Sequence, residues 1–215
     1  MAYSTSNPPR LISQGAGAST GSLWHYTDGD ALATVIGADY FSNGDGLGMK
    51  ANDTVIVTDE TLGQVVTDCI VSSVTSDGAA TISHRSAQDA EVVTTTNVIT
   101  ADESGKTFYL DLAGGFTSTL PAPFLGAKFK FVVKTAPSTA YIITTNGGAD
   151  IMIGGINELE VDTSDDGPYD ANADTLNFVA SVAVVGDFVI LESDGTSWYY
   201  HGQTNADGGV TTSTA

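Results

Sequence analysis

The chain has 215 residues and a formal net charge of −19, with 26 acidic residues against 7 basic ones. A phosphate backbone would be repelled by this charge, and no Lys/Arg cluster is present to release counterions, so we expect no nucleic-acid partner. Hydrophobic residues make up 41% and charged residues only 15%. This balance is typical of all-β proteins and not of helical bundles. A chain of this length can fold without a metal, cofactor or disulfide, and we expect none of them.

Residues 1–22 are rich in Ser, Gly, Ala, Thr and Pro, and Pro8-Pro9 favours extended backbone. We predict an extended arm that is not part of a core. Fully extended, it would reach about 70 Å, enough to cross onto a neighbouring subunit; a disordered terminus is the alternative. The segment lacks the apolar core of a signal peptide, and no later apolar run is long enough for a membrane span, so we expect neither.

Residues 23–86 are predicted to form a first small β domain. Ser76-Asp77-Gly78 is a strong signal for a tight hairpin. Asp28 or Asp30 is predicted to cap a helical turn or two, which Gly37 would end. The strand patterns cover residues 23–26, 54–58, 64–74 and 79–83.

Residues 87–215 are predicted to form a second, sandwich-like β domain, with segment 87–102 supplying its first strand. The apolar run Phe178–Val185 favours a strand covered on both sides, either by a second sheet or by another subunit. The other strand patterns cover residues 128–133, 140–145, 187–191 and 197–200, with turns expected at 146–148, 154–155 and 193–196. The predicted fold is therefore all-β, with two small antiparallel β domains, barrel- or sandwich-like, after the arm.

Lys128 and Lys130 alternate with Phe129 and Phe131, which predicts lysines on one face of a strand and aromatics on the other. In an oligomer of this acidic chain, we expect such a basic strand to set subunit register by lying beside the acidic segment 162–174 of a neighbour.

No motif predicts catalysis. His25, His84 and His201 are far apart and lack the spacing of zinc ligands. No Gly-x-Ser-x-Gly and no phosphate-binding glycine loop is present, and Cys69, the single cysteine, lies in a strand pattern where a structural thiol is expected. We predict no enzyme, although a glycosidase carboxylate pair could not be read from sequence and stays an alternative.

The densest acidic segment runs from Asp162 to Asp174. Asp162, Ser164 and Asp166 with Gly167 match the start of a calcium loop, but Ala173 stands where an EF-hand needs a bidentate Glu. An EF-hand is therefore excluded. An irregular, weak calcium site and a solvated acidic loop remain as the two interpretations.

Five parts of the sequence share a further similarity: residues 1–11, 23–27 continuing through Tyr40-Phe41, 48–57, 119–123 and 194–199. They resemble segments of structural proteins of tailed-bacteriophage particles, such as head decoration, head-fibre and tail-fibre proteins. The resemblance implies β-sandwich or barrel-like modules, often trimeric, with an N-terminal part that docks on the particle, and it supplies no catalytic residue. One departure is Asn52-Asp53, where such families usually have Gly-Asp.

We therefore predict a non-enzymatic virion protein, a capsid decoration or head-fibre protein bound to the outside of the shell through residues 1 to about 86. The expected partner is the major capsid protein or another virion protein, and a homotrimer is favoured. The alternative is a tail-fibre or receptor-binding module that recognises a host surface glycan through Trp198 and Tyr200. The docking contacts predicted for the leading hypothesis are Leu11, Ile12, Leu23 and Trp24.

Overall fold

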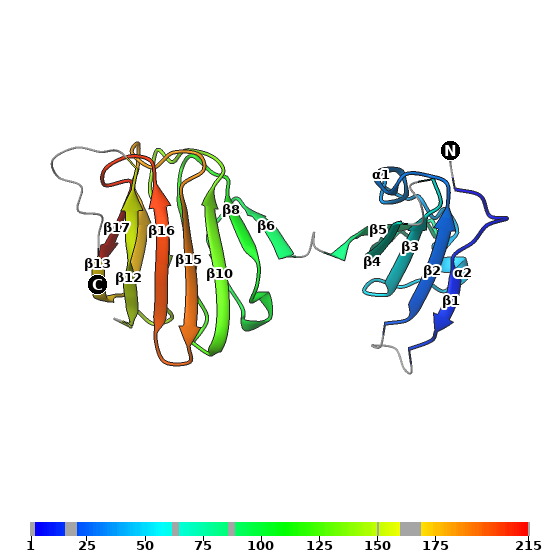
Figure 1. Ribbon diagram of the computed structural model, residues 1–215, viewed down its shortest axis with the longest axis horizontal. Coiled ribbons are helices and arrows are strands. Elements are labelled where there is room, and N and C mark those ends of the chain that lie inside the picture. The colour runs from blue at the N-terminus through cyan, green and yellow to red at the C-terminus, as the bar shows by residue number, and fades with distance from the viewer. Residues whose placement is uncertain are drawn as a thin grey trace. The chain divides into compact units, whose positions relative to one another are not determined.

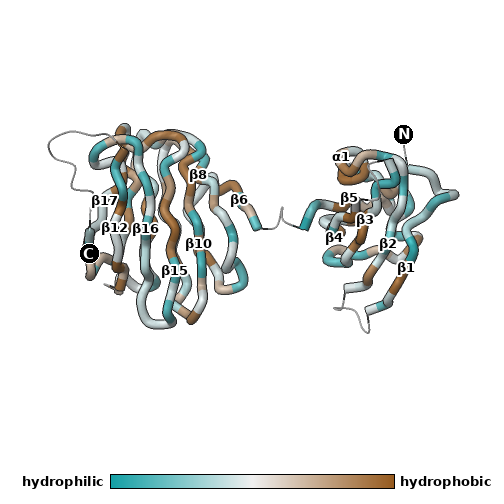
Figure 2. Tube along the Cα trace, viewed as in Figure 1, coloured by the Kyte–Doolittle hydropathy of each residue, from teal (hydrophilic) through white to brown (hydrophobic). Residues whose placement is uncertain are grey.

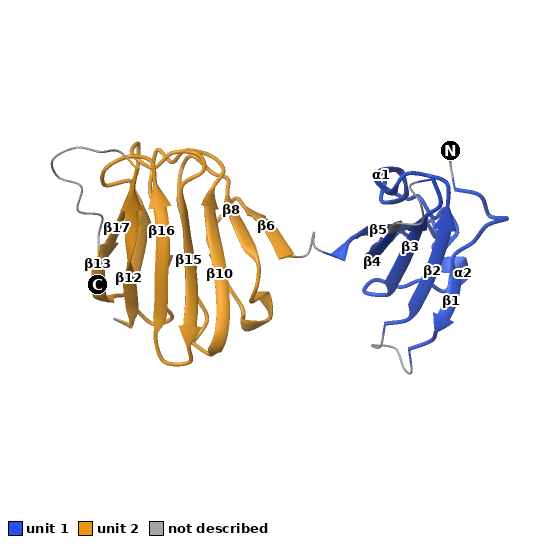
Figure 3. Ribbon diagram, in the orientation of Figure 1, with its two compact units in different colours: residues 1–88 blue, residues 89–215 orange. Residues whose placement is uncertain are grey.

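The computed structural model describes residues 3–15, 21–61, 65–85, 89–149, 151–159 and 169–214. The chain divides into two compact units, residues 1–88 and 89–215 (Figure 3), here unit 1 and unit 2. The predicted all-β class is confirmed, because the described α-helices are two single turns and strands form most of the remaining regular structure.

Unit 1 contains a five-stranded sheet with the order β1-β2-β3-β4-β5 (Figure 1). Its strands are β1 (Arg10–Ser13), β2 (Leu23–Asp28), β3 (Thr54–Asp59), β4 (Val65–Val74) and β5 (Ala80–His84). Strands β2 and β3 are parallel and the other neighbours antiparallel, so the sheet is mixed where we predicted an antiparallel one. The parallel pair needs a long crossover, which residues 29–53 supply with α1 (Leu32–Val35) and α2 (Gly44–Leu47).

One face of this sheet packs on the crossover. Along β3 burial alternates with a period of two, as expected for a strand with one covered face. The buried apolar cluster consists of Trp24, Tyr26, Val35, Phe41, Met49, Val55, Val57, Cys69, Val71, Ala80 and Ile82.

The hairpin predicted at Ser76-Asp77-Gly78 is confirmed, since Gly78 has φ +90° and its N–H donates to the Thr75 carbonyl at 3.0 Å. The predicted helix cap is wrong. Ala31 precedes α1 without a capping side chain, because Asp28 accepts the Asp30 N–H at 2.8 Å instead.

Residues 3–15 belong to unit 1, so the predicted arm outside any core is wrong for this segment. β1 pairs antiparallel with β2. The Tyr3 ring lies 5.8 Å from the Tyr40 ring and 5.3 Å from the Phe41 ring, and Pro9 is buried. The aromatic and apolar side chains of this segment supply contacts that its Ser-, Gly- and Pro-rich composition does not indicate. Residues 16–20 lie outside the described part of the chain.

Unit 2 is sandwich-like, with a seven-stranded sheet in the order β13-β12-β16-β15-β10-β8-β6 and a five-stranded sheet in the order β17-β14-β11-β9-β7. Both sheets are mixed, which again differs from the antiparallel prediction. The strands of the first sheet are β6 (Ala90–Val93), β8 (Thr107–Leu110), β10 (Leu125–Val133), β12 (Met152–Glu158), β13 (Tyr169–Ala173), β15 (Phe188–Asp194) and β16 (Trp198–Thr204). Those of the second are β7 (Asn97–Val98), β9 (Phe116–Thr119), β11 (Tyr141–Thr144), β14 (Thr175–Phe178) and β17 (Val210–Ser213).

The inner faces of the two sheets share one apolar cluster. Hydrophobic stretches run along β15 and part of β10 (Figure 2). Phe129 and Phe131 are fully buried, while Lys128 and Lys130 face outward, so the predicted alternation is confirmed. The segment after residue 87 supplies the edge strand β6, as expected.

Two predictions for unit 2 are wrong. Of the run Phe178–Val185, only Phe178 lies in a strand, because Ser181 has φ +61° and the Val184 N–H donates to Asp187, which closes a turn; Val185 is 65% exposed. Gly154-Gly155 is not a turn but lies within β12, where a Cβ on Gly154 would overlap the Tyr200 carbonyl oxygen.

Candidate functional site

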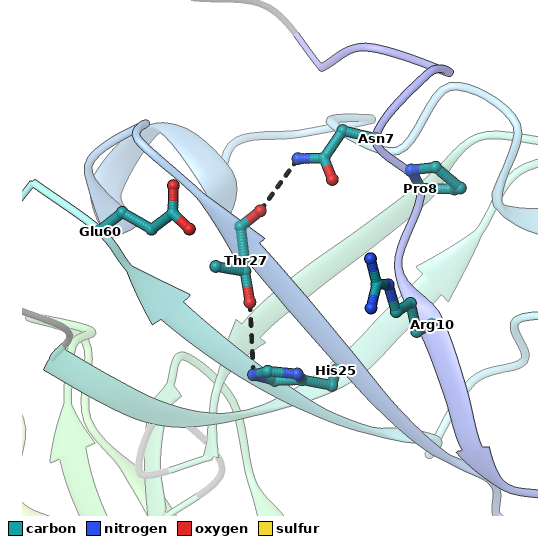
Figure 4. A pocket seen from close by; sticks show the side chains of 6 residues that line it. All are labelled: Asn7, Pro8, Arg10, His25, Thr27 and Glu60. Carbon is teal, nitrogen blue, oxygen red and sulfur yellow. Dashed lines mark hydrogen bonds between the residues drawn. The ribbon is translucent and has the colours of Figure 1, made fainter.

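A pocket of about 340 Å³ opens in unit 1 where the segment before β1 meets β2 (Figure 4). Figure 4 shows the Arg10 and Glu60 side chains on opposite sides of this space, with Thr27 between them. The pocket is lined by Asn7, Pro8, Arg10, His25, Thr27 and Glu60.

Strand register brings the lining together. Arg10 on β1 lies opposite His25 on β2, and Thr27 is on the same face two residues later. The His25 Nε2 lies 2.9 Å from the Thr58 hydroxyl. Asn7 donates to the Thr27 carbonyl at 2.9 Å, which fixes the segment before β1 against β2.

Arg10 has no ion-pair partner in the described part of this acidic chain, and the same is true of Lys50 and Lys130. By contrast, Arg85 contacts Asp68, and Lys106, Lys128 and Lys134 each contact a carboxylate. A free guanidinium is an effective donor to carboxylate or phosphate oxygens.

A network of hydroxyls and carboxylates lies behind this pocket. Burial raises the pKa of Tyr26 far above its usual range and that of Tyr40 to about 12. Partial burial alone would raise the pKa of Asp28, but hydrogen bonds from the Asp30 N–H, Tyr26 and Asn7 outweigh it and hold that pKa below its usual range. Asp28 thus stays ionised and the tyrosines stay protonated, which suits a structural network.

The predicted docking residues divide into two kinds. Leu11 is 45% exposed and Ile12 is 60% exposed, and both lie on β1, the outermost strand of its sheet. Leu23 is half-buried. Trp24 is 3% exposed and donates from Nε1 to Asp53 at 2.8 Å, so its assignment as a docking contact is wrong: the indole is part of the core.

The predicted glycan-binding aromatics are also wrong, because Trp198 and Tyr200 lie inside unit 2 at 0% and 3% exposure. Strand alternation turns Tyr199 outward instead, with 44% exposure, and Tyr169 on β13 is 75% exposed. The alternation around Tyr199 is readable from sequence, but nothing in the sequence singles out Tyr169.

The residues considered for chemistry are mostly dispersed along the chain, and only Cys69 and His84 lie opposite each other, on β4 and β5. His25, His84 and His201 lie on β2, β5 and β16 respectively, and no group of three metal-ligating side chains occurs within the described ranges. Cys69 is buried, and burial raises the pKa of its thiol to about 11, as expected for a structural cysteine.

The proposed calcium segment falls mainly outside the described residues, which exclude Asp162, Ser164, Asp166 and Gly167. The basic strand expected to contact that segment in a neighbour has an internal partner, since Lys128 lies 2.7 Å from Glu192.

Comparisons of this chain with protein-family models, curated proteins and solved structures found no match. Within the described part of the chain, no helix is both long and apolar enough to cross a bilayer.

Proposed function

We propose that this chain is a non-enzymatic structural protein of a tailed-phage particle that decorates the outside of the capsid, with unit 1 as the docking part and a homotrimer as the favoured assembly. The observation that carries the proposal is the outer edge of β1, which presents Leu11 and Ile12 to solvent next to Arg10, which has no ion-pair partner among the described residues. The phage-like segments in the sequence support the same assignment.

The β1 edge suits docking of an extended segment from the major capsid protein or another virion protein. An edge strand offers unpaired N–H and C=O groups to which a partner strand can add, and side chains beside it give specificity. Leu11 and Ile12 would lose their remaining exposure to water, a contribution of about 1 kcal/mol each. Arg10 would pair with a carboxylate of the partner.

The test compares particles assembled with wild-type chain and with the double variant Leu11→Asp/Ile12→Asp. We expect the double variant to fold normally and to be lost from the particle, since two carboxylates would have to be buried in the contact. Val66→Asp is the matched control, because Val66 is 63% exposed in the same sheet. Equal occupancy of double variant and wild type would refute docking through β1.

Labelled-antibody electron microscopy of the same particles locates the chain. Signal over the head supports decoration, and absence of the chain from purified particles rules out a virion role.

The second candidate is a tail-fibre module that binds a host glycan, and it is favoured by the exposed Tyr169 and Tyr199. In the sheet, β12 separates the two tyrosines, with Gly155 opposite Tyr169 and Ile153 opposite Tyr199. Aromatic faces next to a gap left by a glycine suit sugar stacking. Signal over the tail, together with glycan-array binding that Tyr199→Ala removes and the control Tyr109→Ala retains, would establish this function in place of decoration.

A further inference from the structure

The outer face of the five-stranded sheet in unit 2 is a patch of neutral side chains. Cross-strand register aligns them in two rows over β9, β11, β14 and β17, pointing away from the inner cluster. One row is Thr119, Thr144, Thr175 and Ser213, and the other is Thr117, Ile142, Asn177 and Thr211. We call these eight residues the neutral face.

The neutral face contrasts with the rest of the molecule. None of its eight side chains is charged, in a chain whose net charge is −19. The opposite outer face, on the seven-stranded sheet, carries Lys128, Lys130 and Glu192. Val98 extends the neutral face at one edge: it lies opposite Thr119 and is 70% exposed.

Several polar side chains of this face can make further hydrogen bonds. Asn177 donates to Ser213 at 3.3 Å and Thr175 to Asp174 at 2.7 Å. The hydroxyls of Thr117, Thr119 and Thr211 make no hydrogen bond to any described residue. They can pair with water or with equivalent hydroxyls of another molecule, and the threonine methyls and Ile142 add apolar surface.

We infer that the neutral face is a self-association surface, whose occupant is the neutral face of a second copy of this chain. Two molecules with this net charge repel each other over most of their surfaces, and contact costs least where no charged side chain must be desolvated or opposed. An acidic or basic partner would gain nothing from a face without charge, whereas a second copy meets matching hydroxyl and methyl groups.

The contact is weak because it is small. Four strands about 4.8 Å apart, with about four residues each, cover about 250 Å², compared with about 800 Å² per partner in stable complexes. It therefore matters where copies are held close together, as on a particle surface, where the effective concentration reaches the millimolar range. The particle surface as the place where copies meet is the only part of this inference that rests on the proposed function.

The test uses the full chain in sedimentation velocity over a concentration series up to about the millimolar range, where a contact of this size becomes populated. We expect weak self-association of the wild type. Position 144 lies between Thr119 and Thr175 in one row of the face. Thr144→Glu and Thr144→Lys should each raise the dissociation constant at least tenfold, because like charges then meet. An equimolar mixture of the two variants should associate again, at least as well as the wild type.

Thr107→Glu, at a half-buried threonine on the outer face of the other sheet, is the control and should behave as wild type. A wild type whose average mass does not rise with concentration, variants that associate as wild type does, or a mixture whose average mass does not rise would each overturn the inference. Failure here is distinct from failure of particle docking, because docking is measured with the β1 variants on particles.

Discussion

Asp53 is a buried carboxylate that holds three parts of unit 1 together. It is 1% exposed and accepts hydrogen bonds from the Ser22 N–H at 2.7 Å, Trp24 Nε1 at 2.8 Å and the Lys50 N–H at 3.0 Å. Buried donors that lose their acceptor cost free energy. Asp53→Ala should therefore lower the unfolding free energy of unit 1 by about 2–4 kcal/mol.

Urea unfolding measures this loss, with Asp45→Ala as the control because Asp45 is exposed. A change of less than about 0.5 kcal/mol for Asp53→Ala, the range of ordinary surface substitutions, would contradict the structural role of this carboxylate.

The ion pair of Glu103 with Lys106 gives unit 2 a pH-dependent contribution to stability. Partial burial alone would raise the pKa of Glu103, but hydrogen bonds from Thr100 and the contact with Lys106 at 2.9 Å outweigh it and lower that pKa to about 2. A carboxyl whose pKa is lowered on folding stabilises the fold above its unfolded pKa, near 4.3, and loses this effect as pH falls toward 2.

Glu103→Gln should thus cost about 1 kcal/mol at pH 7, after allowance for partial exposure, and progressively less as pH falls from the unfolded pKa of about 4.3 toward the folded pKa of about 2. Urea midpoints of unit 2 against pH measure the difference, with the exposed neighbour Asp102→Asn as control. A difference from wild type that stays constant with pH would show that the charge of Glu103 contributes nothing.

Single residues were harder to place from sequence than strands. The strand pattern around Trp198 correctly separates Trp198 and Tyr200 from Tyr199, but it does not say which face is covered. In the structure the β16 face with Trp198 packs against Phe129, with ring centroids 5.7 Å apart. The glycan hypothesis therefore named the buried pair, because covering depends on a second sheet that local sequence does not reveal.

At the scale of elements, β12 depends on a glycine for close approach to its neighbour. A Cβ at Gly154 would overlap the Tyr200 carbonyl, so β12 and its neighbour β16 in the seven-stranded sheet would have to separate. Gly154→Ala should destabilise unit 2 by about 3 kcal/mol. Thermal unfolding measures this, and Gly114→Ala is the control, since its Cβ would meet only Leu112 at 4.0 Å. A melting temperature of Gly154→Ala equal to that of the wild type would contradict the close packing of β12 against β16.

Strands with strong alternation, such as those at residues 54–58 and 128–133, and the hairpin at residues 76–78 were predictable because their signals are local. Which strands pair with each other in the sheets was not predictable. The parallel pairs β2/β3, β8/β10 and β12/β16 join segments far apart in the sequence. The apolar run after Phe178 predicts a strand, but in the structure a turn closed by Asp187 occupies that stretch. Apart from the buried Ala183, its apolar side chains are only partly buried or exposed, and the stretch belongs to no sheet.

The candidate site was predictable only in part. Leu11 and Ile12 were expected to contact a partner, and they are exposed. The pocket beside them was missed, because it depends on the register that brings Arg10 opposite His25, and that register arises only once residues 10–13 join the sheet as a strand.

At the scale of the whole molecule, the buried apolar residues form two clusters, one in each unit, and we expect two cooperative unfolding steps. Cys69 reports the first cluster, because it is buried in unit 1 and its thiol pKa is raised to about 11. At pH 8 the folded protein should react with a thiol reagent very slowly and the unfolded protein quickly. In a urea series, Asp53→Ala should shift the midpoint of thiol exposure to a lower urea concentration.

Gly154→Ala, which affects only unit 2, should leave the midpoint of thiol exposure unchanged. A shift of the thiol midpoint by Gly154→Ala as large as that caused by Asp53→Ala would show that the two clusters unfold as one.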